Sequence, residues 1–201
     1  MSPAFERPTA RVRGYNLVEL MMTIAIAALL SALALPAFTT MMLNNRRSVL
    51  GNELVTSFML ARGESAKRGQ PVTVCANTAA GGTACTGGTD WSYGWMVFAD
   101  LNGNGAFDAG AGDTLLKKYV SDYPYGGPGV GTKITATIYT TPTTNGYVVV
   151  QPFNQASTIA TLTLCDKRLA AEARAVAITV TGRSAVVDKD SNNGNAALAC
   201  P

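Results

Sequence analysis

The sequence contains no histidine, the side chain that most often acts as a general base near neutral pH and most often binds metal ions. Charge is also scarce, at 14% of the residues. Three of the 16 basic residues and one of the 13 acidic residues fall in the first 14 positions, which leaves 13 against 12, a net charge of +1. Overall charge therefore gives no argument for a nucleic acid or an acidic partner.

Signs of catalysis are missing as well. Serine and threonine are abundant without a histidine to activate them, and no glycine-rich loop follows a strand to open a helix. There is no internal repeat and no interdomain linker. For 201 residues we expect one globular domain plus an appendage, with no enzymatic activity and no resident cofactor.

What is present begins with an apolar run from Leu17 to Leu35, 19 residues in which Glu19 is the only charge. As a helix with a rise of about 1.5 Å per residue, it would span roughly 29 Å, close to the hydrocarbon thickness of a bilayer. Basic residues precede the run and do not return until Arg46, which favours a cytoplasmic N-terminus and a single pass. A secretory signal would be shorter and would end at a small-residue cleavage site.

Glu19 needs an explanation, because a carboxylate in hydrocarbon costs at least about 2.5 kcal/mol. One interpretation is a plain membrane anchor in which Glu19 reaches up to the lipid headgroups. The other is a buried ion pair with a cation from a neighbouring subunit, which the dipole at the helix N-terminus would assist. In the second interpretation the charge of Glu19 is compensated only when the two subunits pack in the register that brings the cation to it.

Beyond Pro36 the helical period returns as a single apolar stripe made of Leu43, Leu50, Leu54, Phe58 and Ala61. The pattern predicts one helix over residues 16–67, and Arg68-Gly69-Gln70-Pro71 supplies its stop signal. Short β-branched and aromatic runs follow, separated by glycine, asparagine and proline. They predict antiparallel strands with one face against the helix, at 72–76, 93–99, 114–120, 133–139, 147–151, 158–164, 175–180 and 184–187.

The four cysteines show no Cys-x-x-Cys spacing. Without a histidine to complete a zinc site, and with a membrane-targeting start, two disulfides in an oxidising compartment are favoured over four reduced thiols. Three connectivities remain open. Joining nearest neighbours pairs Cys75 with Cys85 around a glycine-rich loop, and Cys165 with Cys200 to tie down the tail.

Gly14-Tyr15-Asn16-Leu17-Val18-Glu19-Leu20 resembles the prepilin cleavage motif of type IV pilins and type II secretion pseudopilins. The resemblance implies that a prepilin peptidase/methyltransferase cuts after Gly14 and methylates the new N-terminus at Tyr15. It also implies that the retained helix packs into a filament core, where Glu19 pairs with the α-amino group of a neighbouring subunit.

Three later segments, NELVTSFMLARGESAKRGQPVTVCAN, WSYGWMVFADLNGNGAFDAGAGD and LCDKRLAAEARAVAITVTGRS, resemble the GspH/FimT branch of minor pilins and pseudopilins. The implied fold is α+β, a long N-terminal helix on antiparallel sheets. It divides into a leader (1–14), a membrane and filament-core helix (15–38), an amphipathic continuation (39–68) and a β domain (69–201).

The role implied by this branch is that of a low-abundance subunit near a pilus tip that primes assembly; a type II secretion pseudopilin is the alternative. The expected partners are other major and minor pilins and an inner-membrane assembly platform. The expected location is the inner membrane, with the C-terminal domain in the periplasm, and then the pilus.

Two local motifs suggest further binding. In DLNGNGAFD, Asp100, Asn102, Asn104 and Asp108 are spaced around Gly105 as in a calcium loop, but Ala111 stands where a bidentate glutamate is wanted, so a structural turn is favoured over calcium. Gly182-Arg183 matches the first half of a Gly-Arg-x-Arg motif through which some members of the branch bind DNA. Ala185 replaces the second arginine, although a patch could also draw on Lys167, Arg168 and Arg174.

Replacing Gly14 by valine should block leader removal, because a branched side chain would occupy the position before the scissile bond. We expect the variant to remain in the membrane with its first 14 residues attached, as measured by gel mobility and by the intact mass. The unmodified chain, whose mature form should begin with N-methylated Tyr15, is the control, and normal cleavage of the variant would contradict the assignment.

Overall fold

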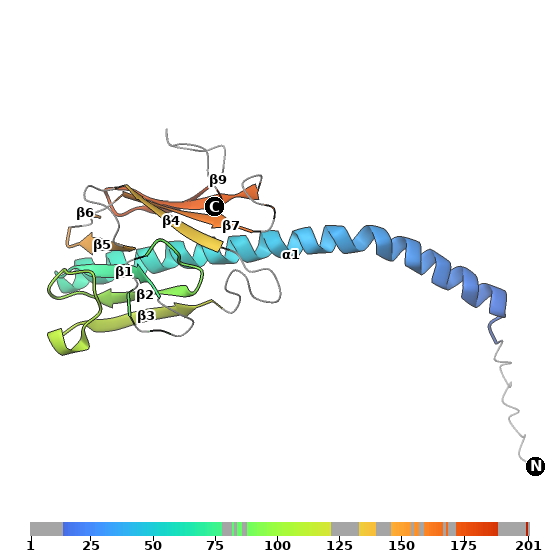
Figure 1. Ribbon diagram of the computed structural model, residues 1–201, viewed down its shortest axis with the longest axis horizontal. Helices are drawn as coiled ribbons and strands as arrows, with labels where there is room; N and C mark the ends of the chain where they lie inside the picture. Colours follow the sequence, from blue (N-terminus) through green and yellow to red (C-terminus); the bar gives the residue numbers. More distant parts are fainter. Residues whose placement is uncertain are drawn as a thin grey trace, which may run out of the picture. The chain divides into compact units, whose positions relative to one another are not determined.

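The computed structural model describes residues 14–77, 82, 84–85, 88–121, 133–139, 146–153, 155–156, 159–166, 168, 172–188 and 200. These residues form a long helix and two antiparallel sheets (Figure 1). The chain divides into two units, residues 1–42 and 43–201, and helix α1 (Leu17–Arg68) contributes to both. The basic leader and Lys167 lie outside the described residues.

In the first unit, every residue over 14–42 is exposed. This part of α1 contains a stretch that is long and apolar enough to cross a membrane. Its hydroxyl side chains donate to carbonyls of their own helix: Thr23 to Leu20, Ser31 to Ala27, and both Thr39 and Thr40 to Pro36. These polar groups are thus satisfied without water, as an apolar environment requires.

In the second unit, α1 buries a stripe on one face and ends close to the predicted residue, at Arg68 rather than Lys67. Gly69 adopts a φ of 66° and donates its N–H to Ser65 O at 2.9 Å, which closes the last turn as the stop signal predicts. The Ser65 hydroxyl lies 2.8 Å from Gln70 O and 3.0 Å from Val150 O. The end of the helix is therefore fixed to a strand.

Two sheets cover the helix. The first has the order β3-β2-β1-β5-β6, from β1 (Val72–Ala76), β2 (Gly94–Ala99), β3 (Thr114–Val120), β5 (Tyr147–Gln151) and β6 (Gln155–Ala156). The second has the order β4-β7-β8-β9, from β4 (Lys133–Tyr139), β7 (Ile159–Cys165), β8 (Arg174–Ile178) and β9 (Ser184–Asp188). All the pairs are antiparallel.

The predicted bounds of β1, β3, β4 and β5 are confirmed; those of β2 and β9 differ by one residue at one end, and those of β7 and β8 by one or two residues at both ends. The short strand β6 and a 3-10 turn, η1 (Ala109–Ala111), were not predicted. Neither is long enough to show a hydrophobic period, which is the signal that the other elements carry.

One core joins the helix to both sheets. Leu54, Phe58 and Ala61 of α1 are fully buried against inward residues of both sheets, among them Val74 on β1 and Leu162 on β7. Burying side chains as large as leucine or phenylalanine stabilises the fold by about 1.5 to 3 kcal/mol each. The helix thus provides the surface on which both sheets are assembled, as the amphipathic stripe predicts.

The nearest-neighbour disulfides are confirmed: Cys75 is bonded to Cys85, and Cys165 to Cys200. Their sequence separations are 10 and 35 residues. In the chain-entropy model, loops of these lengths restrict the unfolded state by about 3 and about 4 kcal/mol. The second bond therefore adds the larger restraint, and it joins β7 to a residue near the end of the chain.

Position 94, at the start of β2, requires a glycine for two reasons: its φ is positive, and there is no room for a side chain. Its φ is 110°, and an added Cβ would lie 2.1 Å from Tyr119 O on the neighbouring strand. We expect Gly94→Ala to destabilise the fold by about 2 to 4 kcal/mol, measured as the urea midpoint of the detergent-solubilised chain.

Gly69→Ala is the matched control for this substitution, because Gly69 also has a positive φ but no atom within 4 Å of an added Cβ. Its expected cost is about 1 kcal/mol. Equal costs at the two positions would show that the strand contact at Gly94 does not matter.

Candidate assembly site

The sequence-predicted assembly residues lie at the start of α1. Gly14, Tyr15 and Asn16 precede the helix, and Leu20 N donates to Asn16 O at 3.1 Å to close the first turn. Glu19 lies in that turn, where the unpaired backbone N–H groups favour an anion. Its side chain is exposed, and no cation of the described residues lies within ion-pair distance of it. The charge is available to a group from outside this part of the chain.

The surface around Glu19 is apolar on all sides. Large apolar side chains in this half of α1 are between 42% and 76% exposed, including Leu17, Met22, Leu29, Leu33 and Leu35. So large an exposed apolar surface marks a contact with lipid or with other proteins. The exposed half of α1 therefore has the surface of a segment that contacts lipid or other proteins.

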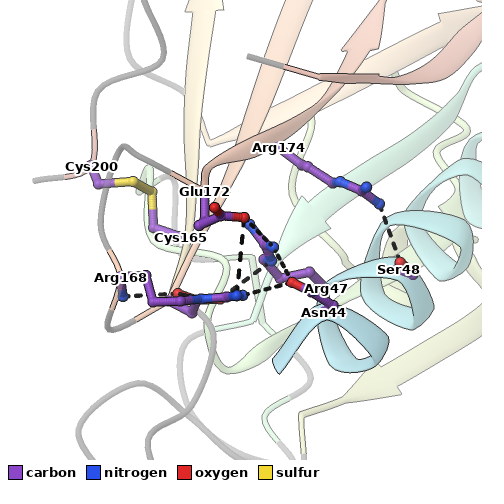
Figure 2. A network of polar contacts seen from close by, with 9 residues as sticks. Asn44, Arg47, Ser48, Cys165, Arg168, Glu172, Arg174 and Cys200 are labelled. Atoms are coloured by element: carbon purple, nitrogen blue, oxygen red, sulfur yellow. Dashed lines mark hydrogen bonds and ion pairs between the residues drawn. A yellow bond between two sulfur atoms is a disulfide. The ribbon is translucent and has the colours of Figure 1, made fainter. Parts of the chain in front are cut away.

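A second polar site lies within the second unit, where Arg47 of α1 meets the segment that follows β7 (Figure 2). We call it the Arg47 network; it comprises Asn44, Arg47, Asp166, Arg168 and Glu172. Arg47 Nε lies 3.3 Å from Asp166 Oδ2, and Arg168 Nη2 lies 2.6 Å from the same oxygen. Asn44 Oδ1 accepts from both arginines, at 2.6 and 2.9 Å.

Burial makes this network energetically important. Arg47 is 3% exposed and Asp166 1%. Burial by itself raises the pKa of the Asp166 carboxyl, but hydrogen bonds from the Arg168 side chain and backbone, together with the charges of Arg168 and Arg47, outweigh it and lower the pKa. The carboxylate therefore stays ionised, as a buried arginine requires.

The acidic loop over 100–113 places its predicted calcium ligands around backbone N–H groups. Asp100 is buried and accepts from Thr73 Oγ1 at 2.7 Å, from Gly105 N at 2.8 Å and from Asn104 N at 3.1 Å. Asn102 accepts from Asn104 N, Asn104 from Ala106 N, and Asp108 from Gly110 N. Among the described residues, no group of three or more histidine, cysteine, aspartate or glutamate side chains is placed to hold a metal ion. The loop therefore has the geometry of a self-capped turn.

The candidate DNA-binding arginines are not brought together. Arg174 lies opposite Asp188 in the backbone register at one end of the β8–β9 hairpin, whereas Arg183 lies in the turn at the other end. Arg168 is engaged by Asp166, and Arg174 Nη1 lies 3.2 Å from Ser48 Oγ (Figure 2). Because phosphate affinity scales with the number of cationic contacts, this separation weakens the electrostatic case for DNA.

Sequence reasoning missed the Arg47 network. A usable signal was present, since Arg47 follows Leu43 by four residues and precedes Leu54 by seven, which places it on the buried stripe. An arginine at such a phase predicts a buried acid elsewhere. Nothing in the sequence identifies Asp166 as that acid.

A helix with an exposed apolar first half, an acidic residue in its first turn and antiparallel sheets on its second half defines a pilin-like subunit. The family model described as type II transport protein GspH matches residues 50–183, more than half of the chain. The chain therefore belongs to the GspH family of type IV pilins and pseudopilins, as the sequence motifs predict.

The fold is similar to that of the type IV minor pilin FimU of Pseudomonas aeruginosa strain PAO1. Its crystal structure in space group P21 gives a TM-score of 0.50 at 16% identity, covering 72% of this chain and 89% of that one. The structure in space group P65 gives 0.48 at 15% identity, with 70% and 91% covered. A comparison with curated protein sequences finds no match.

Asp166→Asn should destabilise the second unit by about 3 to 5 kcal/mol, because it removes the buried anion of Arg47 and leaves only Glu172, whose side chain is 49% exposed, as its acidic neighbour. Folding lowers the pKa of Asp166, so the ionised carboxyl contributes to the free energy of unfolding above its pKa in the unfolded chain, about 4. This contribution is lost as the pH falls below that value. We therefore expect the urea midpoint of the unmodified chain to fall more than that of the variant between pH 7 and pH 3.

Glu172→Gln is the matched control, because Glu172 is 49% exposed and lies 3.4 Å from Arg47. It should cost less than about 1 kcal/mol. A similar loss for both variants would contradict the central role of Asp166.

Proposed function

We propose that the chain is a minor type IV pilin, a low-abundance subunit that sits near the tip of a pilus and primes its assembly. In this proposal a prepilin peptidase removes residues 1–14 and methylates Tyr15 at the inner membrane. The second unit lies in the periplasm, and the assembly platform then moves the subunit into the filament among other major and minor pilins. The observation that carries the proposal is Glu19, an exposed acid without a described cation in an exposed apolar helix.

Cleavage would supply the missing cation. It converts the amide nitrogen of Tyr15 into an amine, and the amine of a neighbouring copy or relative can then approach Glu19. Four residues separate the two groups in one chain, so the neighbour must be displaced along the helix axis by roughly 6 Å. Any other register leaves a carboxylate and an amine buried without partners, which costs several kcal/mol. One ion pair can therefore select the stagger of the subunits.

A minor pseudopilin of type II secretion is the second candidate, and the description of the matched family as a type II transport protein favours it. The same cleavage and the same ion pair would serve in either filament. The two candidates are separated by the major subunit that copurifies with the tagged chain, which is either a pilin of surface pili or a pseudopilin of the secretion system.

Glu19→Ala should leave membrane insertion unchanged, because it makes the segment more apolar, and should reduce incorporation into filaments about tenfold or more. The measurement is the ratio of filament-bound to membrane-bound chain after shearing the cells. Glu64→Ala is the control, since Glu64 is an acid of the same helix whose partners are Arg68 and Lys67 of its own last turn. Incorporation of the Glu19 variant at the level of the control would refute the ion-pair mechanism.

A further inference from the structure

The turn between β5 and β6 carries an exposed aromatic side chain on an unfavourable backbone. Phe153 is 91% exposed, and its φ of 74° is the only positive φ of a non-glycine residue in the described part of the chain. Glycine or asparagine would adopt this conformation with less strain. Among the described residues the ring gains almost no packing, so neither local geometry nor the described core explains a phenylalanine here.

This turn lies at the end of the second unit where α1 terminates, close to the turn that follows β8. The Ser65 hydroxyl lies 3.0 Å from Val150 O, Val150 pairs with Ala156 across β5 and β6, and Ala156 N donates to Val180 O at 3.0 Å. Figure 1 shows β5 and β6 beside the C-terminal end of α1. We call this end of the second unit the turn face; the exposed side chains of these segments that the argument uses are Lys67, Arg68, Phe153, Val180 and Arg183.

The turn face combines apolar area with positive charge. Val180 is 56% exposed, and Arg183 is exposed in the same turn. Lys67 and Arg68 at the end of α1 share a single acid, Glu64, at 3.7 and 2.7 Å. A complementary surface would offer an apolar recess for the ring and carboxylates around its rim.

We propose that the turn face docks a second pilin subunit of the same filament, which receives Phe153 in an apolar recess rimmed by carboxylates. This inference rests on the proposed function, since it assigns a contact within the filament. A single aromatic anchor in a desolvated pocket can carry most of the binding energy of an interface. The turn face thus adds a chemically selective contact to the unselective apolar surface of α1.

Nucleic acid is a poorer fit to the same surface. Affinity for phosphate rises with the number of cations that can each meet one, and two of the three cations at this end share Glu64. A recess on a protein partner would contact the Phe153 ring and Val180 as well as the cations of the turn face. DNA is therefore an outcome of the test and not the proposed partner.

The test places the photo-cross-linking residue p-benzoylphenylalanine at position 153 of the full-length chain, in cells that assemble the filament. Position 101 is the control, because Leu101 is also an exposed apolar side chain, at 51%, on a different loop. We expect an adduct with another pilin at about tenfold or more above the control, identified by mass spectrometry. No excess over the control, or an adduct with DNA, would overturn the proposal.

Phe153→Gly and Phe153→Asn separate binding from folding, because both residues accept a positive φ. We expect an equal or higher melting temperature for each, together with about tenfold less copurifying pilin. Unchanged copurification would overturn the docking surface. If the unmodified chain never enters filaments but still forms the pilin adduct in the membrane, the proposed function fails and the docking surface stands.

Discussion

The fold of the second unit depends on one helical stripe that serves two sheets. Leu54, Phe58 and Ala61 are buried against both, so neither sheet completes its core without α1. The helix also reaches an edge strand of each sheet: Glu53 is paired with Lys117 on β3, and the Ser184 hydroxyl on β9 lies 3.4 Å from Val55 O. These edge contacts place the helix across the opening between the sheets, where it both fills the core and joins its two sides.

The same stripe contains a buried charge. Arg47 falls in phase with Leu43 and Leu54, so correct packing of the apolar residues forces the guanidinium inside. The arrangement is tolerated because Asp166 is equally buried and Arg168 and Asn44 fix its geometry. A helix shifted by one turn would keep much of its apolar packing but would separate this pair. The buried charges therefore specify the position of α1 more strictly than the hydrophobic residues alone.

The sequence predicts most of the fold because its elements are long enough to show their periods. The bounds of four strands, and those of α1 to within one residue, follow from spacing, and the observed disulfides are the nearest-neighbour pairing among the three connectivities that the sequence leaves open. Other features depend on contacts between distant segments. Asp166 acquires its role only when the end of β7 reaches α1, and the backbone N–H groups that Asp100 accepts from are brought to it only by the folding of the loop over 100–113. Nothing in the sequence indicates that Phe153 is exposed or has a positive φ, because both depend on how the turn between β5 and β6 is folded.

The hydroxyl groups in the first half of α1 have a consequence for neighbouring molecules. Thr23, Ser31, Thr39 and Thr40 all bond to carbonyls of their own helix. Glu19 is therefore the one side chain in the first half of α1 that offers a polar group to a neighbouring molecule. Helices packed beside this half of α1 would meet nearly the same surface from every azimuth. Such a rod accepts unlike neighbours with similar ease, so discrimination among them falls to groups elsewhere on the molecule.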